Sequence, residues 1–87
     1  MEKDTNSVMK CLIDRLKEEL HDVSTYSRLH DELDEIGAER ESEWVEQIAR
    51  EEYSHAIALS KILHMNHQYP DSEELMKLWE TAKRNFE

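Results

Sequence analysis

The chain has 87 residues, a formal net charge of −10, and one each of Gly, Pro and Cys. A chain this short forms one small domain and often needs a staple or a second subunit to complete its core. The single cysteine excludes an internal disulfide, so a metal or another subunit would have to supply such a staple. The acidic balance argues against binding to nucleic-acid phosphates or to an anionic membrane.

The composition predicts an all-α fold in a single domain over residues 1–87. Charged residues make up 37% of the chain, and the commonest residue types favour helices. No apolar run approaches the roughly 20 residues that a bilayer-spanning helix needs, and the first residues do not resemble a signal peptide. We therefore expect a cytoplasmic protein.

The first helix is predicted over about residues 5–34. Cap-forming side chains cluster at residues 4–7, and nothing breaks a helix before residue 34. Its core positions alternate between spacings of four and three, which is the heptad pattern of a helix packed along one stripe. This seam consists of Leu12, Leu16, Glu19, Val23, Tyr26, His30 and Leu33, widened by Leu20 and Leu29. Glu19 thus occupies a position where a core residue is expected.

The second helix is predicted over about residues 38–65, after a tight turn in which Gly37 suits a left-handed backbone. Its seam has the same alternation and consists of Val45, Ile48, Glu52, His55, Leu59 and Ile62. In an antiparallel hairpin, two residues lie side by side when the mean of their residue numbers falls at the turn. The mean for Glu19 and Glu52, and that for Glu19 and His55, both fall at the Ile36–Gly37 turn. We expect these three polar residues at one height, facing inward.

A third, shorter helix is predicted over about residues 71–85. Pro70 ends any preceding helix, and Asp71 with Glu74 has the spacing of a capping box. Its apolar face consists of Leu75, Leu78, Trp79, Ala82 and Phe86. This face is too apolar to stay exposed, so it docks either on the hairpin or on another subunit.

Glu52 and His55 form a Glu-x-x-His pair, whose members share one helix face and can reach one ion. About one such pair is expected by chance in this chain, and it has two, the other being Glu18 and His21. The position of Glu52 and His55 on the seam distinguishes them. Glu18 and His21 are either an outer site through which metal enters or a solvated helix face.

Polar residues on a helical seam have three interpretations here. They form a satisfied polar layer that sets helix register, or the seam is drawn one residue out of place and they are solvated, or they bind a metal. Two carboxylates and one imidazole suit iron or manganese better than a closed zinc site. Di-iron four-helix bundles need twice this set, so two hairpins related by a two-fold axis would complete it.

The chain also resembles a known family, the encapsulated ferritins of the ferritin-like superfamily, over about residues 8–65. The resemblance lies in Glu18-Glu19-Leu20 with Tyr26 seven residues after Glu19, and in Glu51-Glu52-Tyr53-Ser54-His55-Ala56. The chain departs from the family at His21, where an acidic residue is common, and at Thr25, where a Trp is common.

The resemblance implies a helical hairpin with a short C-terminal helix that dimerises into a ferritin-like four-helix bundle. It implies that Glu19 and His55 are terminal iron ligands and that Glu52 bridges two irons shared between subunits. Partners would be a second copy, a ring of dimers such as a decamer, and an encapsulin shell enclosing it as a nanocompartment.

The function expected on these grounds is oxidation of Fe(II) by dioxygen, a ferroxidase activity for iron storage or detoxification. Manganese, zinc or calcium are expected substitutes for iron. Tyr26, one heptad from Glu19, either orients a ligand carboxylate or is an ordinary seam aromatic. Two alternatives remain: a rubrerythrin-like di-iron protein that reduces peroxide, and a metal-free helical interaction protein.

Overall fold

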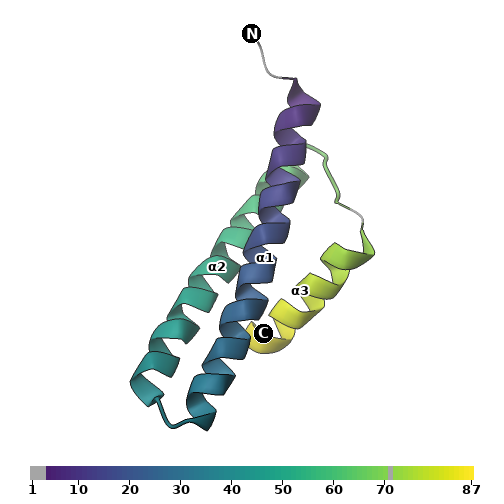
Figure 1. Cartoon of the computed structure of the whole chain (residues 1–87). Coiled ribbons are helices and arrows are strands. Elements are labelled where there is room, and N and C mark those ends of the chain that lie inside the picture. Colours follow the sequence, from purple (N-terminus) through teal and green to yellow (C-terminus); the bar gives the residue numbers. More distant parts are fainter. Residues whose placement is uncertain (1–3, 71) are drawn as a thin grey trace.

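The structure is a computed structural model that describes residues 4–70 and 72–87, and within these residues it contains three helices and no strand. The helices are α1 (Thr5–Glu35), α2 (Glu39–Met65) and α3 (Glu73–Phe86) (Figure 1). The all-helical prediction is confirmed, and every helix begins and ends within two residues of its expected bounds.

The first two helices form an antiparallel hairpin, and α3 returns beside it (Figure 1). α3 packs mainly against α1, so the chain forms an elongated body of 51 × 27 × 17 Å. In the part of the chain that the structure describes, no helix is both long enough and apolar enough to cross a membrane.

Each helix boundary has a local cause. Asp4 caps α1 by accepting a hydrogen bond from the backbone N–H of Asn6 at 3.1 Å. Gly37 has the expected left-handed backbone, with a φ of +78°, and its N–H donates to the carbonyl of Asp34. α3 is capped by Ser72, whose hydroxyl accepts from the N–H of Leu75 at 3.1 Å. The expected cap, Asp71, lies outside the described residues.

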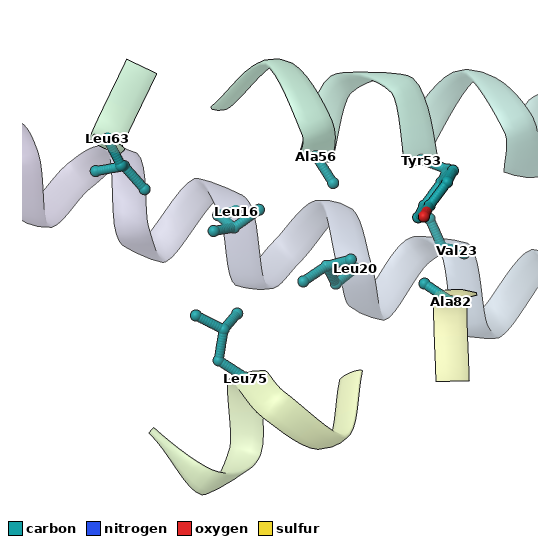
Figure 2. Packing of buried hydrophobic residues seen from close by; sticks show 8 residues of the cluster. All are labelled: Leu16, Leu20, Val23, Tyr53, Ala56, Leu63, Leu75 and Ala82. Carbon is teal, nitrogen blue, oxygen red and sulfur yellow. The ribbon is translucent and has the colours of Figure 1, made fainter. Parts of the chain in front are cut away.

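All three helices contribute to one hydrophobic core, shown in Figure 2. Its buried members are Leu16, Leu20, Val23, Tyr53, Ala56, Leu63, Leu75 and Ala82. The side chains of Leu75 and Ala82 come from α3 and extend toward α1 (Figure 2). The apolar face of α3 therefore docks on its own hairpin, which is one of the two arrangements that the sequence left open.

Tyr53 links α2 to α3. Its ring stacks on Phe86 at a centroid distance of 5.4 Å and meets Trp79 edge to face at 6.1 Å. Its hydroxyl donates a hydrogen bond to the Glu87 carboxylate. Burial of this aromatic side chain beside α3 determines which side of α2 turns toward the core.

As a result, α2 is rotated by one residue from the predicted seam. Its buried positions are Ser42, Ala49, Tyr53, Ala56 and Leu63, and the last four each follow a predicted seam residue. Small Ala49 and Ala56 let α1 approach closely, whereas Ile48 and Ile62 are 38% and 41% exposed. The predicted inward seam of α2 is wrong within a single chain for Ile48, His55 and Ile62, which form an outer stripe together with Trp44. Leu59 packs against the core.

Truncation to alanine should lower the free energy of unfolding much more at a buried position, Leu20, than at an exposed one, Ile36. Leu20 is fully buried, so Leu20→Ala should lower the free energy of unfolding by about 2–5 kcal/mol because it leaves a cavity. Ile36 is 77% exposed, so Ile36→Ala should change it by less than about 0.5 kcal/mol. Urea denaturation followed by circular dichroism measures both. Equal effects would contradict the observed core.

Candidate metal centre

Three potential metal ligands meet on the hairpin. Glu19 comes from α1, Glu52 and His55 come from α2, and one ligand atom of each lies within 4.8 Å of the others. In the described residues this is the one such group of three acidic, His or Cys side chains. The level register expected from the turn at Gly37 accounts for their meeting, since α1 and α2 are antiparallel.

Glu19 is the buried member of the group, with 3% of its surface exposed. Its Oε1 forms an ion pair with Arg15 Nη2 at 2.7 Å. Its Oε2 is buried and, when Glu52 is also ionised, has no hydrogen-bond donor among the described residues; His55 Nδ1 lies 3.5 Å away. A buried carboxylate oxygen without a donor is costly, and a cation between these three side chains would satisfy it.

The two carboxylates titrate differently because they are close together. A hydrogen bond to Glu19, then burial, then repulsion by the charge of Glu19 raise the pKa of Glu52 to about 7. Burial acts to raise the pKa of Glu19, but the hydrogen bond from Glu52 and the charge of Arg15 outweigh it, so this pKa is lowered. In the metal-free chain, Glu19 is therefore the ionised member and Glu52 holds a proton near neutral pH.

The site opens to the protein surface. Glu52 is half-buried and the side chain of His55 is 60% exposed, because both lie toward the outer stripe of α2. The expectation that all three groups face inward is wrong for His55, and its cause is the rotation of α2. The site has a buried carboxylate at its base and an exposed imidazole on its outer side.

The other residues singled out from the sequence lie apart from this group. Tyr26 is half-buried, and no hydrogen bond among the described residues joins it to Glu19. Glu18 pairs with Arg15 at 2.8 Å, and His21 pairs with Glu74 of α3 at 3.2 Å. Glu18 and His21 thus each have another partner, and a metal-entry role for them stays a prediction.

Sequence reasoning missed two residues of the site, Arg15 and Asp22. Arg15 is four residues before Glu19 and three before Glu18, which is the helical spacing of an ion pair and was available in the sequence. The charge of Asp22 contributes to the raised pKa of Glu52, and it is half-buried. No pattern in the sequence distinguishes it from the other acidic residues of α1.

A groove of the described residues lies elsewhere. It has a volume of about 560 Å³ and is lined by Tyr53, Ile57, Ser60, Lys61, Met76, Trp79, Glu80, Lys83 and Glu87. It contains none of the three potential ligands and lies between α2 and α3.

Comparisons with protein-family models, with curated proteins and with solved structures find no match to this chain. The argument for function therefore depends on the geometry of the site and on the sequence motifs.

The raised pKa of Glu52 predicts a specific pH dependence of stability in the metal-free protein. Its protonated form is favoured by folding, so this contribution is present below its ordinary pKa of 4.5 and is lost as the pH rises through about 7. Glu52→Gln, which mimics the protonated acid, should be more stable than the wild type by about 1–2 kcal/mol at pH 8 and by less at pH 5.

Glu51→Gln is the matched control, because it removes the same charge from an adjacent exposed position. Urea denaturation at both pH values measures the free energies of unfolding. An equal gain in the two variants at pH 8 would mean that general charge repulsion, and not the contact with Glu19, causes the effect.

Proposed function

We propose that this chain is a ferritin-like subunit that binds iron and oxidises Fe(II) to Fe(III) with dioxygen. The observation that carries this proposal is the buried Oε2 of Glu19, which faces Glu52 and His55 and has a donor among the described residues only while Glu52 keeps its proton. A polar layer that only sets register would leave no buried carboxylate oxygen without a donor. A cation bound by these side chains removes that deficit.

The donor set fits iron. Two carboxylates and one imidazole are hard oxygen and intermediate nitrogen ligands, which suit Fe(II), Fe(III) and Mn(II). Anionic carboxylates favour the more highly charged Fe(III), so they favour oxidation of bound Fe(II). Two Fe(II) substrates supply the two electrons that reduce one dioxygen to peroxide, which takes up two protons. Glu52 loses its proton when a cation binds, because the positive charge lowers its pKa.

A second copy of the chain would complete the site. One hairpin offers two Glu and one His, which is half of the ligand set of a di-iron four-helix bundle. The open side of the site lies along the outer stripe, where Ile48 and Ile62 flank His55 at helical spacing and are partly exposed. A two-fold interface along this stripe would cover the isoleucines and bring four Glu and two His together.

If the resemblance to encapsulated ferritins holds, Glu19, Glu52 and His55 would hold the iron, with Glu19 and His55 as terminal ligands and Glu52 shared between two irons. Iron storage or detoxification, assembly into a ring of dimers and residence in an encapsulin shell rest on the resemblance of the motifs to encapsulated ferritins. Tyr26 is half-buried one heptad from Glu19, and its role as a group that orients a ligand carboxylate stays a prediction.

Anaerobic titration with Fe(II), followed by exposure to air, tests the proposal. We expect saturation near one iron per chain, an increase in near-ultraviolet absorbance on oxidation, and iron-promoted association. His55→Ala should weaken Fe(II) binding more than about tenfold because it removes a ligand. It should leave the stability of the metal-free protein nearly unchanged, since this side chain is exposed.

Glu51→Gln provides the control for loss of a neighbouring charge and should bind iron as the wild type does. The absence of Fe(II) binding in the wild type, with an unchanged oligomer, would contradict the proposal and favour a metal-free helical interaction protein. Binding without oxidation by dioxygen, but with oxidation by peroxide, would favour the rubrerythrin-like alternative.

The proposed dimer has its own test. Ile62→Glu places a charge on the outer stripe and should abolish association, or raise the dissociation constant at least about tenfold, because an unpaired charge would be buried at the interface. Ile36→Glu makes the same change at an exposed position near the hairpin turn and should have no effect. Sedimentation velocity with and without Fe(II) measures both. Dimers that persist in Ile62→Glu would place the interface elsewhere.

A further inference from the structure

Arg15 contacts the candidate metal centre, and the proposed function assigns it no role. Its Nη2 lies 2.7 Å from Oε1 of Glu19, and its Nη1 lies 2.8 Å from Oε2 of Glu18. We propose that Arg15 is a built-in counter-cation, which balances Glu19 in the metal-free chain and opposes the binding of a divalent cation. This inference rests on the proposed metal site and assigns that site a regulating residue.

A positive charge is needed here because of the burial of Glu19. The side chain of Glu19 is 4% exposed, and a buried carboxylate without an opposite charge strongly destabilises a folded chain. Arg15 supplies that charge from the surface, since its own side chain is 57% exposed. The guanidinium therefore does for the metal-free chain what a bound metal would do for the loaded one.

The two carboxylate oxygens of Glu19 have different neighbours. Oε1 binds Arg15, whereas Oε2 faces Glu52 and His55. A metal held by both oxygens would have to displace the guanidinium from Oε1. A metal held by Oε2 alone would lie close to a fixed positive charge, and two cations this close repel each other. In both arrangements Arg15 and the metal compete for one carboxylate.

Glu18 gives Arg15 a second place to bind. Because the guanidinium already contacts Glu18, release of Glu19 would leave it paired with that carboxylate at the surface. Glu18 lies three residues after Arg15 on the same helix, so the exchange needs only a side-chain movement. Arg15 can thus withdraw without exposing an unpaired charge and without moving α1.

The test compares Mn(II) binding by the wild type, Arg15→Gln and Arg15→Lys, using anaerobic calorimetry so that the metal stays in the divalent state. We expect Arg15→Gln to bind Mn(II) about tenfold more tightly and Arg15→Lys to bind like the wild type, because the opposing charge decides the affinity. Metal-free Arg15→Gln should also melt at a lower temperature. A merely structural role would lower that temperature without tightening binding.

Arg28→Gln is a matched control. Arg28 lies on the same helix, pairs with Glu32 at the same four-residue spacing, and its replacement changes the net charge equally. It should leave Mn(II) affinity unchanged, and circular dichroism checks that every variant is helical. Binding by Arg15→Gln that is equal to or weaker than wild-type binding would overturn the role of Arg15 and leave the metal site standing.

The remaining outcomes separate the two proposals. If Arg15→Gln binds Mn(II) and the wild type does not, Arg15 is the residue that excludes the cation, and the inference is supported. If neither protein binds Mn(II), the metal site itself is refuted, and the inference about Arg15 is refuted with it. Tighter binding in Arg28→Gln equal to that in Arg15→Gln would show a general charge effect and overturn the specific role.

Discussion

A carboxylate with 3% exposure lies between two helices of this chain, and the surrounding charges are arranged around it. Glu19 remains ionised because Arg15 supplies a positive charge and Glu52 supplies a proton. The same contact raises the pKa of Glu52 to about 7, because Glu52 is hydrogen-bonded to Glu19 and two adjacent carboxylates do not easily ionise together. His55 lies within ion-pair distance on the open side. These four groups act as one coupled unit.

The packing of α2 determines that this unit is accessible. Tyr53 turns toward Trp79 and Phe86 of α3, and small Ala49 and Ala56 turn toward α1. The opposite side of α2 then carries partly exposed isoleucines and His55. The rotation that completes the core of one chain therefore also exposes the candidate site.

The three interpretations of the polar seam residues can now be weighed by hydrogen bonding. A satisfied polar layer requires a donor for each buried oxygen, and among the described residues Glu19 Oε2 has one only while Glu52 keeps its proton. The misplaced-seam interpretation is correct for His55, which is largely solvent-exposed, and incorrect for Glu19. The metal interpretation accommodates both observations, because a metal site needs a fixed inner ligand and an open side.

The sequence by itself determined the all-helical fold, the turn at Gly37 and the common level of Glu19, Glu52 and His55. Helix propensity, a single glycine and the geometry of an antiparallel hairpin are local properties, so they can be read from residue order. The tertiary structure alone decided which face of α2 is buried, because two stripes on α2 share nearly the same spacing. One contains Ile48, Glu52, His55 and Ile62; the other contains Ala49, Tyr53, Ala56 and Leu63. They differ by one residue, and periodicity cannot choose between them. The packing of the second stripe in the core with α1 and α3 makes that choice.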